Sequence, residues 1–172
     1  MTEGLEQLNR ASREAAEAAF LSCCGSRRWA QEMTRARPFA GVSELLNKAE
    51  EIWRNLEARD WLEAFAAHPK IGAKKAVRET TARSAEWSQG EQSGTRRATD
   101  SERTELEKLN RLYEDKFGFI FIVCATGKSA VEMLGICRRR LGNTADAELA
   151  AAADEQRKIT EIRLKKLLGS RN

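Results

Sequence analysis

The sequence predicts an all-α protein, a single-domain bundle of about seven to eight helices with one buried extended segment near residues 119–125. Apolar residues recur at spacings of three and four along most of the chain, which is typical of amphipathic helices. Two Ser/Thr-x-x-Glu sequences, beginning at Thr99 and Ser129, have the pattern of capping boxes. The one strand-like apolar run, FIFIVCA, has no evident partner strand, so we expect it to be buried without forming a sheet. A chain of 172 residues is long enough for one domain, residues 1–172, with a hydrophobic core.

Four helices are predicted in the N-terminal part of the chain. The first is rich in alanine, a strong helix former. In the second, Trp29 and Met33 are four residues apart, and Pro38 ends the helix. The predicted helices of this part are residues 11–22, 26–36, 43–56 and 60–67.

Three helices are predicted in the C-terminal part. The helix that begins after Thr99 carries leucines at helical spacing and ends at Gly118. Ser129 begins the next helix, and a Gly142-Asn143 turn separates it from a long final helix. The predicted helices of this part are residues 99–117, 129–141 and 145–168.

Residues 73–98 interrupt this pattern. Apart from Val77 and Trp87 they carry almost no large apolar side chains, so hydrophobic periodicity does not predict a core helix there. We expect a partly ordered surface segment, and connections of this length in a compact domain are often lids or binding loops.

The composition disfavours several classes of protein. The net charge is +4 and the pI is about 9.0, but basic residues are interleaved with acidic ones, as on solvated helix faces, so no nucleic-acid partner is predicted. No run approaches the roughly 20 apolar residues of a membrane span, so no membrane partner is predicted. The start, MTEGLEQLNR, lacks the apolar core of a secretory signal, and the end, GSRN, is not a peroxisomal address. We therefore expect a cytoplasmic protein.

The four cysteines form no C-x-x-C pair. With a single histidine in the sequence, this spacing predicts no structural zinc site. A cytoplasmic domain of this length needs no disulfide bonds. Cys124 and Cys137 lie in apolar contexts, so we expect them to be small buried side chains.

His68 is the only histidine in the sequence. Because Pro69 disfavours a helical conformation in the residue before it, His68 should lie at the end of the helix predicted over residues 60–67. A histidine in this place can exchange a proton near neutral pH. It can also cap the helix, as an imidazolium at the negative end of the helix dipole. The residues alone leave both interpretations open.

The stretch WSQGEQ, residues 87–92, gathers hydrogen-bond donors and acceptors. Ser88, Glu91 and Gln92 can bind a polar ligand, and Gly90 allows a close approach of the backbone. Ser88-x-x-Glu91 also has the pattern of a capping box that begins a helix. The two interpretations are compatible if the helix start lines a pocket.

Arg163 falls on the stripe of the final helix that should face the core. It lies four residues after Ile159 and four before Leu167. A guanidinium on a covered face needs an anionic or strongly polar partner. The two candidates are a glutamate in a structural salt bridge and an anionic or amide-rich ligand.

Together these stretches resemble one enzyme family. They are AxHPKIG around His68, WSxxEQ, KFGFIFIVCATGKSAVEML and ELAAAADEQRKITEIRL, with RPF at residues 37–39 upstream. In this order and spacing they resemble the 2-oxo-4-hydroxy-4-carboxy-5-ureidoimidazoline (OHCU) decarboxylases of urate breakdown, from about Leu8 to Leu167. One departure is Lys70, where the family more often has arginine.

The resemblance implies an all-α, usually dimeric enzyme that converts OHCU to (S)-allantoin and CO₂ with no metal or organic cofactor. It also implies a functional link to a hydroxyisourate hydrolase. The family's catalytic histidine falls on His68 and its paired glutamate on Glu91. The substrate-binding residues that the resemblance implies are Pro69, Ser88, Gln92, Phe121, Ile122, Val123, Cys124, Ala125 and Arg163.

Other classes of protein make different demands on the same sequence. A non-catalytic basic helical binding module would keep the apolar stripes but would have no use for His68 and Glu91 in one cavity. A metal hydrolase is disfavoured by the single histidine.

Overall fold

The protein was studied as a computed structural model, which describes residues 2–73 and 81–169. Within these ranges nine α-helices and one short 3-10 helix form, and no strand does, so the predicted all-α class is confirmed. The number of helices exceeds the predicted seven to eight because Glu3–Arg10 and Ala82–Glu91 are also helical. The chain divides into two compact units, one of Met1–Ala64 with Arg157–Asn172 and one of Phe65–Gln156.

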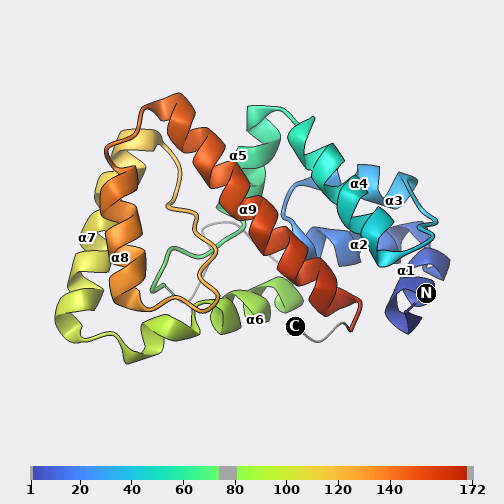
Figure 1. The fold of residues 1–172 in the computed structure, drawn as a ribbon, viewed down its shortest axis with the longest axis horizontal. Coiled ribbons are helices and arrows are strands. Elements are labelled where there is room, and N and C mark those ends of the chain that lie inside the picture. The colour runs from blue at the N-terminus through green and yellow to red at the C-terminus, as the bar shows by residue number, and fades with distance from the viewer. Residues whose placement is uncertain (1, 74–80, 170–172) are drawn as a thin grey trace. The chain divides into compact units, whose positions relative to one another are not determined.

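The elements are labelled in Figure 1. In chain order they are α1 (Glu3–Arg10), α2 (Arg13–Cys23), α3 (Arg27–Arg35), α4 (Val42–Arg54), α5 (Ala58–Ala66), α6 (Ala82–Glu91), η1 (Ser93–Arg97), α7 (Asp100–Phe117), α8 (Ala130–Arg140) and α9 (Ala145–Leu167). The chain passes between the two units inside α5 and inside α9.

The first unit has an aromatic core. In it α2 packs on α3, and α3 packs on α4. Trp29 is completely buried, meets the Phe20 ring edge-on at 5.9 Å between centroids, and donates its indole N–H to the Ala49 carbonyl at 3.1 Å. The bonded indole shows why a tryptophan is tolerated at full burial here, since its polar edge keeps a partner.

The RPF sequence joins α1 to the rest of this unit. The Arg37 guanidinium donates to the carbonyls of Leu8 and Ala11 at 2.7 and 2.9 Å, where the end of α1 leaves carbonyls without helical partners. Asn9 exchanges two hydrogen bonds with the Phe39 backbone, at 2.8 and 3.0 Å. The motif is therefore structural, because it closes the C-terminal end of a helix.

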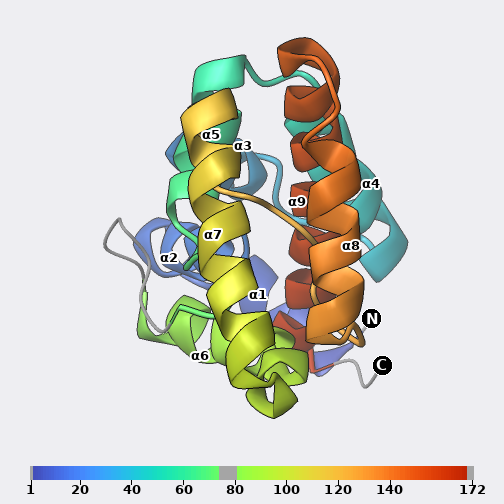
Figure 2. The ribbon, with the colours of Figure 1, turned by 90° about the vertical axis from the view of Figure 1, so that its left-hand side faces the viewer.

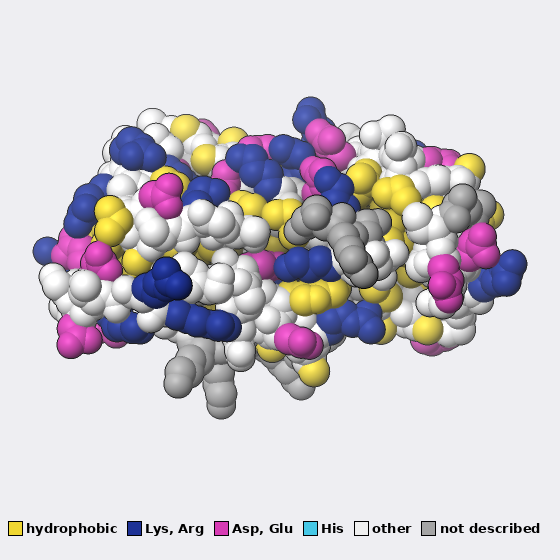
Figure 3. All heavy atoms as spheres, turned by 60° about the horizontal axis from the view of Figure 1, so that its bottom comes forward, with side chains coloured by type: hydrophobic (Ala, Val, Ile, Leu, Met, Phe, Trp, Pro, Cys, Tyr) yellow, Lys and Arg dark blue, Asp and Glu magenta, His cyan; other side chains and the backbone are white. Residues whose placement is uncertain are grey.

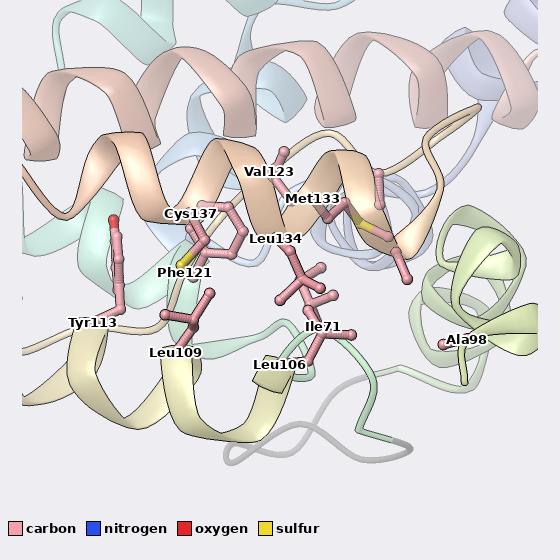
Figure 4. Close-up of a cluster of buried hydrophobic side chains, with 12 residues drawn as sticks. Ile71, Ala98, Leu106, Leu109, Tyr113, Phe121, Val123, Met133, Leu134 and Cys137 are labelled. Atoms are coloured by element: carbon pink, nitrogen blue, oxygen red, sulfur yellow. The ribbon is translucent and has the colours of Figure 1, made fainter. Parts of the chain in front are cut away.

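The second unit is built on α7 and α8, which lie side by side (Figure 2). Between them in sequence, residues 120–125, called the extended segment below, belong to no helix or strand and are buried, as predicted, while Phe119 is partly buried. Side chains of α7, α8 and this segment point toward one another in Figure 4. The buried cluster comprises Ile71, Ala98, Leu106, Leu109, Tyr113, Phe121, Val123, Ala125, Ala130, Met133, Leu134 and Cys137.

Both predicted capping boxes are present. The Thr99 hydroxyl accepts from the Glu102 N–H at 3.2 Å, and the Glu102 carboxylate accepts from the Thr99 N–H at 2.8 Å. Ser129 and Glu132 form the same pair of bonds at the start of α8. Gly118 ends α7 with φ 77°, in the left-handed region that favours glycine.

A buried ion pair supports the extended segment. The Glu148 side chain is completely buried and receives hydrogen bonds from Arg140, Tyr113 and Asn143. A second nitrogen of Arg140 donates to the Ile122 carbonyl at 2.6 Å. Burial, followed by the hydrogen bond to Glu148, raises the pKa of Tyr113, so its hydroxyl stays protonated and keeps donating.

The surface agrees with the charge pattern of the sequence. Lysine and arginine side chains are scattered among aspartate and glutamate on the face that Figure 3 shows. Within residues 2–73 and 81–169, no helix has the length and apolar character needed to cross a lipid bilayer. All four cysteines are free thiols and buried, as expected for Cys124 and Cys137.

Candidate active site

His68 lies just beyond the C-terminal end of α5, as Pro69 led us to expect. Its backbone N–H donates to the Phe65 carbonyl at 3.1 Å, and its side chain is buried, with 8% exposure. The ring nitrogen Nε2 lies 2.7 Å from the Oε1 atom of Gln156 on α9. The backbone of His68 is therefore held by a turn, and its ring contacts a side-chain amide.

Ser88 and Glu91 lie on α6 and Gln92 directly follows it, where the sequence predicted a partly ordered surface segment. This prediction is corrected by the structure, which shows a helix over Ala82–Glu91, capped by the Thr81 hydroxyl. Ser88 and Glu91 lie near its end, so the alternative capping box, in which Ser88 begins a helix, is also wrong. The other part of that segment, residues 74–80 with Val77, lies outside the described residues.

A polar buried face explains why periodicity missed α6. The buried residues of this helix are Ser84, Ser88 and Glu91, and Glu91 is only 8% exposed. Their spacing of four and three places them on one helix face. A helix that buries polar groups produces no apolar stripe, and buried polar groups of this kind need hydrogen-bonding partners or a ligand.

Gln92 braces the loop that follows the histidine. Its Oε1 atom accepts from the Gly72 N–H at 3.0 Å, and its Nε2 atom donates to the Pro69 carbonyl at 3.5 Å. The side chain of Lys70, in the same loop, pairs with Glu114 of α7. The loop is thus tied to both α6 and α7.

Side chains occupy several backbone groups of the extended segment. The Ile122 carbonyl accepts from Arg140, and the Cys124 N–H donates to Glu155 Oε2 at 2.7 Å. The Cys124 carbonyl accepts from Lys128 at 2.7 Å. The segment predicted to contact substrate through its backbone is therefore held in place by three charged side chains.

Electrostatics connect α6 to this segment. The pKa of the Cys124 thiol is raised, first by burial, and also by the negative charges of Glu155 and Glu91, while Lys128 opposes the rise. Glu91 therefore lies within electrostatic range of Cys124. The predicted glutamate and the predicted backbone segment share one region of the second unit.

A pocket of about 380 Å³ opens between the loop after His68 and the end of α6. Three residues predicted to bind substrate, Pro69, Ser88 and Gln92, line it together with Arg96 and Arg103. Neither predicted catalytic residue is among its lining residues in the part of the chain that the structure describes. A second pocket, of about 540 Å³, shares part of this lining.

Comparison with known proteins assigns the family. The OHCU decarboxylase family matches residues 9–165. The chain belongs to the OHCU decarboxylase family. A crystal structure of an OHCU decarboxylase determined in the presence of (S)-allantoin is 39% identical, with a TM-score of 0.77, and the match covers 88% of this chain and 98% of that one. A crystal structure of an (S)-allantoin synthase, 19% identical with a TM-score of 0.69, shares the fold.

Two relatives are longer than this chain. The uric acid degradation bifunctional protein TTL of Arabidopsis thaliana is 40% identical over 92% of this chain, but the match covers 49% of that protein. The bifunctional protein of Bacillus sp. (strain TB-90) is 30% identical over 95% of this chain and 32% of its own length. The chain thus spans about half or a third of these relatives. The OHCU decarboxylase of Haloferax volcanii is 27% identical, with 93% of both chains covered.

Most residues that the OHCU decarboxylase resemblance implies belong to the second unit, and Arg163 belongs to the first. Arg163 is 2% exposed and donates to the Ser22 carbonyl at 3.5 Å. Burial raises the pKa of the Cys24 thiol to about 11, and the positive charge of Arg163 opposes that rise. That Arg163 and His68 contribute to the same site stays a prediction.

Two α9 residues that contact the site were not predicted as part of it. Gln156 lies on the buried stripe between Ala152 and Ile159, so a polar residue at a core position was a signal, as it was for Arg163. Glu155 lies off that stripe, and its contact with the Cys124 N–H had no signal in the pattern. Among the described residues, no group of three or more His, Cys, Asp or Glu side chains is arranged to hold a metal ion.

Proposed function

We propose that this chain decarboxylates OHCU to (S)-allantoin and CO₂ without a cofactor. The family assignment supports this activity, and the 39% identical structure determined in the presence of (S)-allantoin supports the ligand class. The observation that carries the proposal is a helix face that buries Ser88 and Glu91, in the same unit as the buried His68 and within electrostatic range of Cys124. A stability role alone gives no reason to bury so many polar groups together.

The chemistry fits residues that only bind and move protons. OHCU carries a carboxylate and a hydroxyl on one ring carbon, next to a C=N bond. When the bond to CO₂ breaks, its electron pair forms a C=C bond with the neighbouring carbon and displaces the C=N electrons onto nitrogen. The substrate is thus its own electron sink. Loss of the hydroxyl proton, protonation of the neighbouring carbon and protonation of the nitrogen that received the C=N electrons then give allantoin.

In this proposal His68 and Glu91 are the catalytic pair. His68 performs a proton step, as base toward the hydroxyl or acid toward carbon. Glu91 holds the ureido N–H groups or orients the histidine. The residues assigned to substrate binding are Pro69, Ser88, Gln92, Phe121, Ile122, Val123, Cys124, Ala125 and Arg163. Burial of the carboxylate favours its departure as neutral CO₂.

The assembly and setting are proposed from the family as well. We expect one domain over residues 1–172, because α5 and α9 each run unbroken from one unit into the other. We also expect a homodimer in the cytoplasm, supplied with OHCU by a hydroxyisourate hydrolase. The bifunctional uric acid degradation relatives support a second activity linked to this one. Light scattering in solution tests the dimer.

The decisive experiment generates OHCU in solution and follows allantoin by circular dichroism. The protein should accelerate its formation and yield one enantiomer, because a chiral pocket protonates one face. His68→Asn should fold normally, slow the reaction by about 10²- to 10⁴-fold and give nearly racemic product. Prolonged EDTA treatment should leave the parent rate unchanged.

Two results contradict the proposal. A parent protein that leaves the spontaneous rate unchanged favours the non-catalytic binding module, which a salt titration against duplex DNA then examines. A fast, stereospecific His68→Asn variant returns the histidine to the role of a helix cap.

A further inference from the structure

The contact between His68 and Gln156 joins two buried side chains far apart in the sequence. Gln156 is completely buried and His68 is 8% exposed. Their closest polar atoms, Nε2 of the histidine and Oε1 of the glutamine, are 2.7 Å apart. At this distance the hydrogen bond is short, and water competes little for either group.

The atoms in contact determine which nitrogen carries the proton. An amide oxygen has no hydrogen and can only accept, so Nε2 must be the N–H donor. In the neutral imidazole the other nitrogen, Nδ1, then holds the lone pair. We propose that Gln156 is a positioning residue, which keeps His68 in the Nε2–H tautomer and makes Nδ1 the atom that exchanges a proton with the substrate. The catalytic part of this inference rests on the proposed function.

A neutral partner has a chemical advantage at this position. A carboxylate on a ring N–H stabilises the imidazolium, as the carboxylate on Nδ1–H does in hydrolase triads, whereas an amide orients the ring without adding charge. The loop, α6 and α9 carry several charged residues, among them Lys70, Glu91 and Glu155. Substitution of Gln156 leaves all three in place.

The adjacent residue strengthens the inference. Glu155 accepts from the Cys124 N–H at 2.7 Å, so one short stretch of α9 holds both the histidine and the extended segment. A shared support fixes the distance between two parts of a site better than two separate loops do.

The proton steps can be written through one nitrogen. Nδ1 of His68 takes the proton from the substrate hydroxyl as the bond to CO₂ breaks, which gives a transient imidazolium. The same Nδ1–H then returns the proton to the neighbouring carbon, and the ring is neutral again. Nε2–H stays bonded to Gln156 throughout. The ring nitrogen that received the C=N electrons takes its proton from water, so the overall reaction consumes one proton.

The first test is nuclear magnetic resonance of the ring. Because the sequence has one histidine, two-bond ¹⁵N–¹H correlations of the ¹⁵N-labelled protein belong to His68 alone. At alkaline pH we expect the Nε2–H tautomer in the parent and in Gln156→Glu, which keeps an acceptor. Gln156→Leu should give a mixture of tautomers. The control is Gln31→Leu, which removes a side-chain hydrogen bond to Glu17 on another helix, and it should match the parent. An Nδ1–H tautomer in the parent overturns the proposal.

The second test is kinetic. Gln156→Leu should lower kcat by about 10- to 100-fold with a smaller change in KM, and thermal melts check that it folds. Gln156→Glu should keep more activity and titrate its histidine at higher pH than the parent, since a carboxylate favours the imidazolium. Full kcat in a folded Gln156→Leu removes the positioning role. A parent with no decarboxylase activity removes the proposed function instead, and the tautomer measurement still decides the contact.

Discussion

The buried ion pair of Arg140 and Glu148 offers the most direct test of what holds the extended segment. Glu148 is completely buried, and its Oε1 atom lies 2.5 Å from one guanidinium nitrogen of Arg140 and 2.7 Å from another. The third nitrogen of Arg140 holds the Ile122 carbonyl. The perturbations are Glu148→Leu, Arg140→Met and the double variant.

The expected magnitudes follow from the burial of both charges. Removing one partner of a buried pair leaves the other charge uncompensated, which destabilises a protein by about 3–5 kcal/mol. Each single variant should lose that much of a total stability of about 5–15 kcal/mol. In the double variant no buried charge remains, and the losses are the partners of the Ile122 carbonyl and the Tyr113 hydroxyl, about 1–3 kcal/mol each. Arg140→Met alone already loses the first of these, and Glu148→Leu alone loses the second. The double variant should therefore be more stable than either single variant.

The assay is equilibrium unfolding in urea, followed by far-ultraviolet circular dichroism. The matched control is the exposed pair of Arg138 and Glu105, whose side chains are 56% and 33% exposed and whose atoms are 3.2 Å apart. The cycle of Arg138→Met and Glu105→Leu should give a coupling energy below about 1 kcal/mol. If the buried pair shows a coupling no larger than this control, the reasoning about uncompensated charge is wrong.

Three further predictions address packing, pH and ligand binding. A Cβ added to Gly94 would lie 1.9 Å from the Lys128 carbonyl oxygen, so Gly94→Ala should cost about 1–3 kcal/mol in thermal melts. Gly90 lies within α6 and an added Cβ meets no atom there, so Gly90→Ala should instead stabilise the protein by about 0.5–1 kcal/mol. Equal effects of Gly94→Ala and Gly90→Ala would refute the close approach of Gly94 to the Lys128 carbonyl. Burial raises the pKa of Cys24 to about 11, so the folded state favours the neutral thiol. The contribution of this thiol to stability is therefore fully present below its ordinary pKa and is lost as the pH rises through about 11. Cys24→Ala should flatten that alkaline loss in urea titrations. Arg163→Lys should weaken (S)-allantoin binding, measured by calorimetry, and should have little effect on the Tm. A lower Tm with unchanged affinity would instead indicate a structural role.

The longer elements with an apolar face could be predicted from the sequence, because burial there follows hydrophobic spacing, although the short α1, which buries Leu5 and Leu8, was not predicted. Thr99 and Ser129 cap α7 and α8 as the pattern predicted, and Gly118 ends α7. Burial of the 119–125 run without a sheet could be predicted, because the run is apolar and the sequence offers helices, not a second strand, on both sides of it. The helix α6 was not predicted, since its buried face is made of two serines and a glutamate.

For the candidate site, the sequence pattern could identify residues but not their partners. His68 was placed at a helix end by the proline after it, which is a local effect of the backbone. Its contact with Gln156 spans 88 residues, and no local rule brings these two positions together. The same holds for Glu155 and Cys124, 31 residues apart. Such pairs depend on tertiary packing, which periodicity does not encode.

The extended segment connects the stability of the second unit with its proposed chemistry. Every buried N–H and C=O group needs a partner, and a strand without a sheet must find its partners elsewhere. Charged side chains supply three of these partners: Arg140 donates to the Ile122 carbonyl, Glu155 accepts from the Cys124 N–H and Lys128 donates to the Cys124 carbonyl. Of these three side chains Arg140 is buried, while Glu155 and Lys128 are partly exposed. In the proposed function, the same contacts hold this backbone in one orientation before an anionic, amide-rich substrate binds, so the groups that take the place of a sheet would also prepare the site.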